Sequence, residues 1–301
     1  MPRLSLNALR SQDMNEALFY ERYDGNAVKC ILCPHACIIP QSKTGRCRVR
    51  RNIDGSLYSE IFGKVSSISL DPIEKKPLCM FHPGSRILSV GSFGCNLTCP
   101  FCQNSDISIN FGDDLEKAGY LNPEQVVFYA QGTVSDNNIG VAYTYNEPLI
   151  GYEFVLESSR LIHQAGLLNV VVTNGYINKE PLEKLLPYID AMNIDLKSYN
   201  EEFYKKLGGS LPPVIKTIET AYTWCHIEIT TLVILEENDS EDESKKLAER
   251  IASISDKIPL HLSRFFPRYR YANKKPTSRE TIIKLKEVAN RHLEYVFTGN
   301  M

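Results

Sequence analysis

The chain has 301 residues, 43% of them hydrophobic, and a formal net charge of −2. This composition is ordinary for a chain with a packed core, and the near-neutral charge argues against a general affinity for nucleic acid or an anionic membrane surface. No apolar run reaches the ~18 residues that cross a bilayer, and residues 1–21 lack the apolar centre of a signal peptide. We therefore expect a cytoplasmic protein whose nine cysteines serve metal or redox chemistry rather than disulfides.

The N-terminal part is rich in cysteine. A short helical pattern covers residues 13–23, and four cysteines with the spacing C-x2-C-x3-C-x9-C follow within 18 positions. Four thiolates so close together suit one tetrahedral metal ion or an iron–sulfur cluster, and unligated thiols are the third alternative. The opening C-x2-C pair resembles a zinc knuckle and favours zinc, although iron–sulfur sites share such spacings. The four candidate ligands are Cys30, Cys33, Cys37 and Cys47.

A small β layer is expected after these cysteines. Residues 56–62 and 64–70 alternate in polarity as half-buried strands do. The segment 71–77, Asp-Pro-Ile-Glu-Lys-Lys-Pro, is charged and bounded by proline, which predicts a loop, and its position directly before the next unit would let it line that unit. We place a cysteine-rich, metal-binding subdomain over 1–84 and a larger core over 85–301.

Strand and helix signals alternate through the larger core. Asn122-Pro123 and Pro148 mark helix starts, and Gly166 marks a helix end. Alternation of this period implies right-handed βαβ units and a parallel sheet. Six repeats and a final strand are too few for a closed eight-fold barrel, so we predict an α/β fold with a partial (β/α)6 TIM-like barrel beside the small N-terminal β subdomain. The predicted strands are 86–91, 139–145, 168–173, 190–196, 226–234, 259–265 and 294–298.

The loop after the first of these strands carries three cysteines, Cys95, Cys99 and Cys102, in the pattern C-x3-C-x2-C. Iron–sulfur clusters are held by cysteine thiolates. Three such ligands leave one iron of a four-iron cluster without a protein partner, and that iron is open to a substrate. A zinc site or reduced structural thiols are the alternatives on spacing alone.

Polar residues recur at the carboxyl ends of the predicted strands, which is where the active sites of such barrels lie. Helix caps and turns place some polar residues there in any fold. They do not readily explain a set that recurs strand after strand. The set consists of Asn146 and Glu147, Thr173 and Asn174, Asp195 and Lys197, and Arg264.

These motifs resemble the radical SAM superfamily, in particular the branch with the glycyl-radical-enzyme activases such as pyruvate formate-lyase activating enzyme. The matching stretches are G-C-N-L-T-C-P-F-C at 94–102, T-N-G at 173–175 and D-L-K at 195–197. Almost the whole chain is similar to the AmmeMemoRadiSam-system radical SAM enzymes, through C-x2-C-P-H-x-C at 30–37 and the segment 71–77, among other stretches.

The resemblance implies a [4Fe-4S] cluster on the three loop cysteines, S-adenosylmethionine (SAM) on its open iron, and one-electron cleavage of SAM to a 5′-deoxyadenosyl radical. Glu147 would then accept hydrogen bonds from the SAM amino group. Lys197, Arg264 or Thr173 would hold the SAM carboxylate. Asp195 would contact a ribose hydroxyl, Lys197 or a cation. The candidate cofactor-binding residues are Phe101, packing on adenine, together with Asn146, Glu147, Thr173, Asn174, Asp195, Lys197 and Arg264.

We therefore predict a radical SAM oxidoreductase that abstracts hydrogen from a protein or a small molecule, with an electron donor such as flavodoxin or ferredoxin. Val172 replaces the acidic residue that the activases carry there for a cation beside SAM, so the resemblance does not extend to that cation site. The additional cysteines precede the SAM motif instead of following it, which weakens the inference that the protein activates a glycyl radical enzyme. A non-catalytic iron–sulfur or zinc protein for electron transfer or scaffolding is the alternative, and no nucleic-acid or membrane partner is expected.

Overall fold

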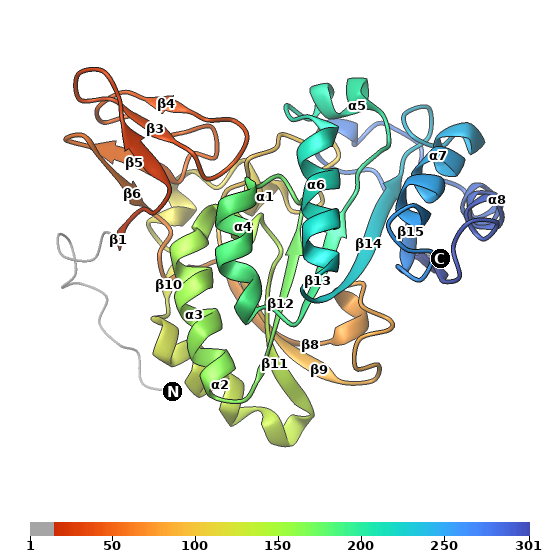
Figure 1. Cartoon of the computed structure of the whole chain (residues 1–301), viewed down its shortest axis with the longest axis horizontal. Coiled ribbons are helices and arrows are strands. Elements are labelled where there is room, and N and C mark those ends of the chain that lie inside the picture. Colours follow the sequence, from red (N-terminus) through yellow and green to blue (C-terminus); the bar gives the residue numbers. More distant parts are fainter. Residues whose placement is uncertain (1–14) are drawn as a thin grey trace.

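The computed structural model describes residues 15–301, and its N-terminal part consists of two small antiparallel sheets at one end of the molecule (Figure 1). One sheet joins β1 (Asn15–Glu16), β6 (Ser56–Ser59) and β5 (Arg50–Ile53); the other joins β2 (Tyr20–Arg22), β3 (Val28–Cys30) and β4 (Ile38–Ile39).

The helix predicted over 13–23 is wrong where these residues are described. Asn15 lies opposite Ser59 in one sheet, and Tyr20 lies opposite Cys30 in the other. Strand partners distant in sequence form hydrogen bonds with the backbone N–H and C=O groups of these residues. Tertiary pairing therefore overrides a local helical pattern. Residues 13 and 14 lie outside the described part of the chain.

The large unit is built on one sheet of eight strands in the order β16-β15-β14-β13-β12-β11-β9-β8. Neighbouring strands are parallel except β8, which runs antiparallel to β9. The predicted α/β class and partial barrel are confirmed. The strands are β8 (Ser67–Pro72), β9 (Arg86–Gly91), β11 (Asn138–Thr144), β12 (Leu168–Thr173), β13 (Ala191–Asp195), β14 (His226–Val233), β15 (Leu260–Arg264) and β16 (Val296–Gly299), while β7 (Lys64–Val65) and β10 (Gly119–Tyr120) form a separate pair.

Strand β8 ties the N-terminal subdomain to the barrel. The sequence assigns residues 64–70 to the small β layer, but β8 pairs along its whole length with β9, from Ser67 opposite Gly91 to Pro72 opposite Arg86. The barrel sheet therefore begins before residue 85, and a domain boundary at 84 stays a prediction.

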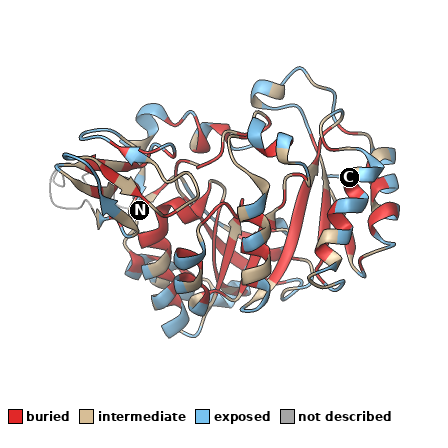
Figure 2. Ribbon diagram, turned by 45° about the horizontal axis from the view of Figure 1, so that its top comes forward, coloured by how far each residue is buried: buried red, intermediate tan, exposed pale blue. Residues whose placement is uncertain are grey.

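Helices cover the outer face of the sheet. Side chains cap several helix starts: at the predicted start, Asn122 accepts from the Gln125 backbone in a capping box, and Ser240 and Ser278 cap later helices. The longer helices bury one face and leave the other exposed (Figure 2). The helices are α1 (Ser105–Ser108), α2 (Pro123–Gly132), α3 (Tyr152–Gln164), α4 (Lys179–Leu185), α5 (Glu201–Lys206), α6 (Leu211–Tyr222), α7 (Glu241–Ala252) and α8 (Arg279–Ala289).

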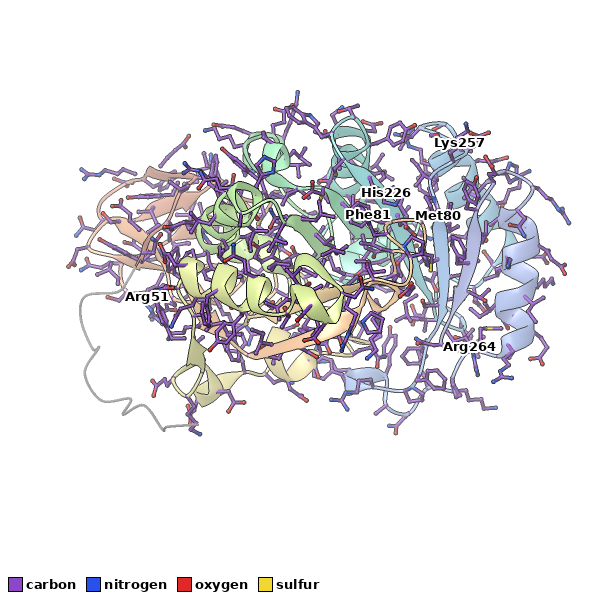
Figure 3. The ribbon with its side chains drawn as sticks, turned by 90° about the horizontal axis from the view of Figure 1, so that it is seen from below. Arg51, Met80, Phe81, His226, Lys257 and Arg264 are labelled. Atoms are coloured by element: carbon purple, nitrogen blue, oxygen red, sulfur yellow. The ribbon has the colours of Figure 1, made fainter. Side chains whose placement is uncertain are left out.

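The inner face of the sheet is closed at its amino-terminal edge by residues 73–84, which we call the closing segment. Ile73 and Leu78 of this segment pack in one apolar cluster with Ile87 and Ala142 from the inner face. Only Ile73–Lys75 form a short 3-10 helix; the preceding Asp71 and Pro72 end β8, so the loop predicted over 71–77 is partly strand and helix. Seen from below, Met80 and Phe81 lie beside His226, the first residue of β14 (Figure 3).

Candidate functional site

The cluster loop, residues 92–104, leaves the carboxyl end of β9 and carries three cysteines. Cys99 is buried, and Cys95 and Cys102 are partly buried. Gly94, two residues into the loop, has φ +83°, and a Cβ there would lie 2.9 Å from the backbone oxygen of Cys47. Glycine is needed at this position because the loop presses directly on the N-terminal subdomain.

The three thiols lie in a setting that suits metal coordination. Leu97 N donates to Cys95 Sγ at 3.3 Å, and Asn174 Nδ2 donates to the same sulfur at 3.5 Å. Burial raises the pKa of Cys99 to about 12, so this thiol needs a metal to become a thiolate at neutral pH. As their side chains stand, no three His, Cys, Asp or Glu residues in 15–301 are arranged to hold one metal ion.

The Glu147 carboxylate is buried at the next strand end and is held by three donors. Its Oε1 accepts from Leu149 N at 3.1 Å and from Thr173 Oγ1 at 2.7 Å, and its Oε2 accepts from Asn174 N at 2.7 Å. Burial is the main reason that the pKa of Glu147 rises to about 7, against these hydrogen bonds. Because each carboxylate oxygen has two lone pairs, Oε2 keeps one acceptor position for a further donor.

Asn174 joins this carboxylate to the cluster loop. Its backbone binds Glu147, while its side-chain Nδ2 donates to Asn96 Oδ1 at 2.9 Å as well as to Cys95 Sγ. Thr173 Oγ1 also accepts from Gly175 N at 3.0 Å. Thr173 is therefore engaged on both sides, and its hydroxyl fixes the orientation of Glu147.

Asn146 anchors the start of the same loop. Its Oδ1 accepts from Ser92 N at 3.0 Å, and its Nδ2 donates to Phe93 O at 2.9 Å and to Gly94 O at 3.2 Å. This residue acts as a positioning residue for the loop, because its amide is already bonded to protein backbone.

Asp195 and Lys197, beyond the end of β13, form an ion pair with side chains that are largely buried. Burial alone would lower the pKa of Lys197, but the charges of Asp195 and Cys99 raise it above its usual value. Lys197 therefore stays protonated, and its charge in turn counteracts the rise in the Cys99 pKa.

Two predicted residues have other partners in the structure. Phe101 is buried, and its ring stacks on Phe203 with centroids 5.9 Å apart. Arg264 Nε donates to Thr277 O at 2.9 Å, and the guanidinium lies 5.0 Å from the Phe266 ring centroid. Figure 3 shows Arg264 away from the Met80–His226 region, and no hydrogen bond within residues 15–301 joins it to Glu147 or Asp195. A SAM contact for either residue remains a prediction.

The barrel interior holds a charged cluster for which the sequence gives only a hint. Lys76 is 2% exposed, and its Nζ lies 2.7 Å from Asp71 Oδ2 and 4.6 Å from the Tyr145 ring centroid. Tyr145 Oη donates to the same Asp71 oxygen at 2.5 Å. Although burial raises the pKa of Asp71, its bonds to Lys76 and Tyr145 bring it well below its usual range. The proline-bounded charge run at 71–77 is the signal that could have identified this cluster.

A family model described as the radical SAM superfamily matches residues 89–248. The chain belongs to the radical SAM superfamily. The match spans more than half of the 301 residues and includes the cluster loop. Membership implies a [4Fe-4S] cluster and SAM, and the donor set described above fits both. No helix in residues 15–301 is long and apolar enough to cross a bilayer.

Relatives of this chain include activating enzymes and a protein of unknown activity. An uncharacterized protein of Methanocaldococcus jannaschii is 41% identical over 294 residues, which cover 96% of this chain and 86% of the relative. The pyruvate formate-lyase 1-activating enzyme of Escherichia coli is 22% identical over 227 residues, covering 70% and 90%. A putative glycyl-radical enzyme activating enzyme of M. jannaschii is 23% identical over 261 residues, covering 82% and 89%.

Solved structures show the same fold at low identity. A radical SAM methyltransferase from Sphaerobacter thermophilus aligns with a TM-score of 0.56 at 15% identity, covering 73% of this chain and 67% of its own. QueE from Escherichia coli aligns with a TM-score of 0.52 at 13% identity, covering 79% and 94%. These similarities support the partial barrel but do not identify a reaction.

Proposed function

We propose that this chain is a radical SAM oxidoreductase that cleaves SAM reductively and abstracts hydrogen from a protein or small-molecule substrate. Cys95, Cys99 and Cys102 would hold the [4Fe-4S] cluster. When bound, the cluster and SAM supply one-electron cleavage of the sulfonium, which yields methionine and a 5′-deoxyadenosyl radical. The observation that supports this most is the hydrogen-bonded connection from Cys95 Sγ through Asn174 to Glu147.

The residues around the cluster loop have distinct roles in this proposal. Glu147 accepts a hydrogen bond from the SAM amino group at the acceptor position that remains on Oε2. Lys197 is a fixed cation for the SAM carboxylate, and Asp195 orients it through their ion pair. Asn146 and Thr173 position the loop and the Glu147 carboxylate, because their polar atoms are engaged with protein.

The decisive experiment is SAM cleavage by the reconstituted protein. The chain is loaded anaerobically with iron and sulfide, reduced, and given SAM. Methionine and 5′-deoxyadenosine should appear together, and Cys95→Ala should form neither because it cannot hold the cluster. A well-formed cluster that yields no cleavage product would instead favour a non-catalytic electron carrier.

The substrate side of the proposal rests on the barrel interior and on the activase relatives. Asn193 Oδ1 and Thr230 Oγ1 lie on β13 and β14 and are buried without a hydrogen-bond partner in the described chain. Buried polar atoms are normally paired, so a polar substrate group that bonds to them would fit this interior. Similarity to activating enzymes makes a protein backbone one candidate hydrogen donor, and a small polar metabolite is the other.

A substrate is identified by following deuterium. Candidate proteins or metabolites labelled with deuterium are added to the cleavage reaction, and the true donor transfers label to 5′-deoxyadenosine. Label from a protein glycine supports activation of a glycyl radical enzyme, whereas label from a metabolite contradicts it. We place the reaction in the cytoplasm, with flavodoxin or ferredoxin as the class of electron donor.

A further inference from the structure

A cavity of about 20 Å³ in the N-terminal subdomain is lined by Cys30, Cys33, Cys37 and Cys47. Cys30 ends β3, Cys33 and Cys37 lie between β3 and β4, and Cys47 lies in the turn before β5. Antiparallel pairing of β3 with β4 folds this segment back on itself, so that Cys30 N donates to Cys37 O at 2.9 Å. The strand pairing therefore brings four thiols from a short stretch of chain to one enclosed space.

Four thiolates suit one tetrahedral zinc ion or an iron–sulfur cluster, and the sequence alone favours zinc. Zinc has no redox chemistry, whereas an iron–sulfur cluster transfers single electrons. The position of these thiols beside the cluster loop therefore favours a cluster over zinc.

A backbone N–H donates to one of these sulfurs. Arg46 N donates to Cys37 Sγ at 3.5 Å, in the way that Leu97 N donates to Cys95 Sγ in the cluster loop. Such bonds stabilise the negative charge of metal-bound thiolates and orient them.

A buried guanidinium supplies positive charge at the cavity. Arg50 lines it, and its side chain is 1% exposed. The two Nη atoms bond to the Glu153 carboxylate at 2.9 and 3.1 Å, but Nε has no hydrogen-bond partner in the described chain. A buried N–H without an acceptor is rare. An anionic cluster with four thiolate ligands would offer that acceptor.

The cavity adjoins the cluster loop. Asn96, which follows Cys95, is one of its lining residues, as is His35. The His35 Nε2 atom lies 2.7 Å from Asn96 O, and Asn96 Oδ1 accepts from Asn174 Nδ2, which also donates to Cys95 Sγ. The two cysteine groups are therefore connected by a single residue and its hydrogen bonds.

We propose that Cys30, Cys33, Cys37 and Cys47 ligate a second [4Fe-4S] cluster, which passes electrons one at a time to the SAM-binding cluster. A reduced flavodoxin or ferredoxin gives one electron to the second cluster, and the same electron then reduces the first, so no bond or proton changes at the second site. Ligation by four cysteines leaves no open iron there, so SAM binds only at the first cluster. The site stands by itself, whereas the electron relay rests on the proposed function.

Metal content tests the site independently of SAM chemistry. The variant Cys95→Ala/Cys99→Ala/Cys102→Ala, loaded anaerobically with iron and sulfide, should keep about four irons and four sulfides per chain. Its reduced EPR signal should not respond to SAM. Cys33→Ala should instead lose about half of the wild-type iron and keep an EPR signal that changes when SAM is added. The control variant Cys225→Ala, at a thiol outside both cysteine groups, should keep the full wild-type iron content. Zinc without iron, or no metal, in the triple variant would overturn the proposal even if Cys33→Ala fails to fold.

The relay is tested by changing the reductant. With reduced flavodoxin, SAM cleavage by Cys33→Ala should fall about tenfold, equivalent to about 1.4 kcal/mol in the barrier. With dithionite, which reduces the first cluster directly, cleavage should match the wild type. An equal loss with both reductants, or a loss with neither, would overturn the relay. Absence of cleavage by the wild type with either reductant would refute the proposed function and leave the metal result standing.

Discussion

At the scale of single residues, the sequence identifies the groups that gather at the cluster loop but not what each one contacts. The sequence identifies Glu147, Thr173 and Asn174 because they lie at or just after the carboxyl ends of parallel strands, which meet at one edge of the sheet. Their mutual bonds depend on the register of β11 against β12, where Tyr143 lies opposite Val171. Spacing does not supply that register. The sequence therefore predicts a SAM contact for Thr173, and the bond from its hydroxyl to Glu147 is seen only in the structure.

Removal of the Glu147 carboxylate should weaken SAM binding without loss of the cluster. A hydrogen bond to a charged group contributes about 1.5 to 3 kcal/mol. Glu147→Ala should therefore raise the Kd for SAM roughly ten- to a hundredfold. The measurement is a SAM titration of the anaerobically reconstituted protein, followed by the EPR spectrum of the reduced cluster.

Two matched variants make this result specific. Glu147→Gln keeps the shape but removes the charge, so it should show most of the same loss. Glu124→Ala changes an exposed glutamate on α2 and should bind SAM as the wild type does. An unchanged Kd in Glu147→Ala, or loss of its iron, would contradict the assigned role.

At the scale of elements, regular alternation made the barrel predictable and the irregular segments were not. The strand predicted over 86–91 coincides with β9 (Arg86–Gly91) because an apolar run leads into a loop of glycine and cysteine. The strand predicted over 64–70 overlaps β8, but its alternation does not reveal its partner, and the pairing with β9 places it in the barrel sheet instead of the small β layer. For the closing segment, the sequence indicates that residues 71–77 could line the barrel, but it does not reveal the contacts of the segment, because its partners come from strands far along the chain.

The fully buried Glu228 on β14 anchors this closing segment. Its carboxylate accepts from Cys79 N at 3.0 Å and from Met80 N at 2.8 Å. His226 and His261 also bond to it, at 3.0 and 2.6 Å. Burial raises the pKa of Glu228, but these bonds lower it more strongly, to about 2.

Glu228 should make folding stability depend on pH in the acid range. A carboxyl whose folded pKa lies below its unfolded value of ~4.3 stabilises the protein above pH ~4.3 by about 3 kcal/mol, and this contribution is lost as the pH falls toward 2. Glu228→Gln should therefore be less stable than the wild type at pH 7. The difference in unfolding free energy between the two proteins should become smaller between pH 5 and pH 3. Urea unfolding of the iron-free proteins measures this, with exposed Glu124→Gln as the control. A gap that stays constant with pH would show that Glu228 does not titrate as proposed.

At the scale of the whole molecule, the N-terminal subdomain and the barrel meet through a buried ion pair. Arg50 lies on β5, and Glu153 lies on α3. Their side chains are 1% and 4% exposed. Leu18 completes the contact, because its backbone N–H donates to Glu153 Oε1 at 2.7 Å and its oxygen accepts from Arg50 Nη2 at 2.6 Å. The two units should therefore unfold together, although the sequence separates them by composition.

A double-mutant cycle on this pair tests the coupling. Arg50→Met or Glu153→Leu alone leaves one charge buried without its partner, which should cost about 3 to 5 kcal/mol of unfolding free energy. The double variant Arg50→Met/Glu153→Leu should lose much less than the sum, because no uncompensated charge remains. The exposed pair Lys246–Asp242, 2.7 Å apart on α7, is the matched control and should show no measurable coupling. Urea unfolding of the iron-free proteins measures the unfolding free energies of the wild type, the two single variants and the double variant. Additive losses would mean that the two charges are screened by solvent and do not join the subdomain to the barrel.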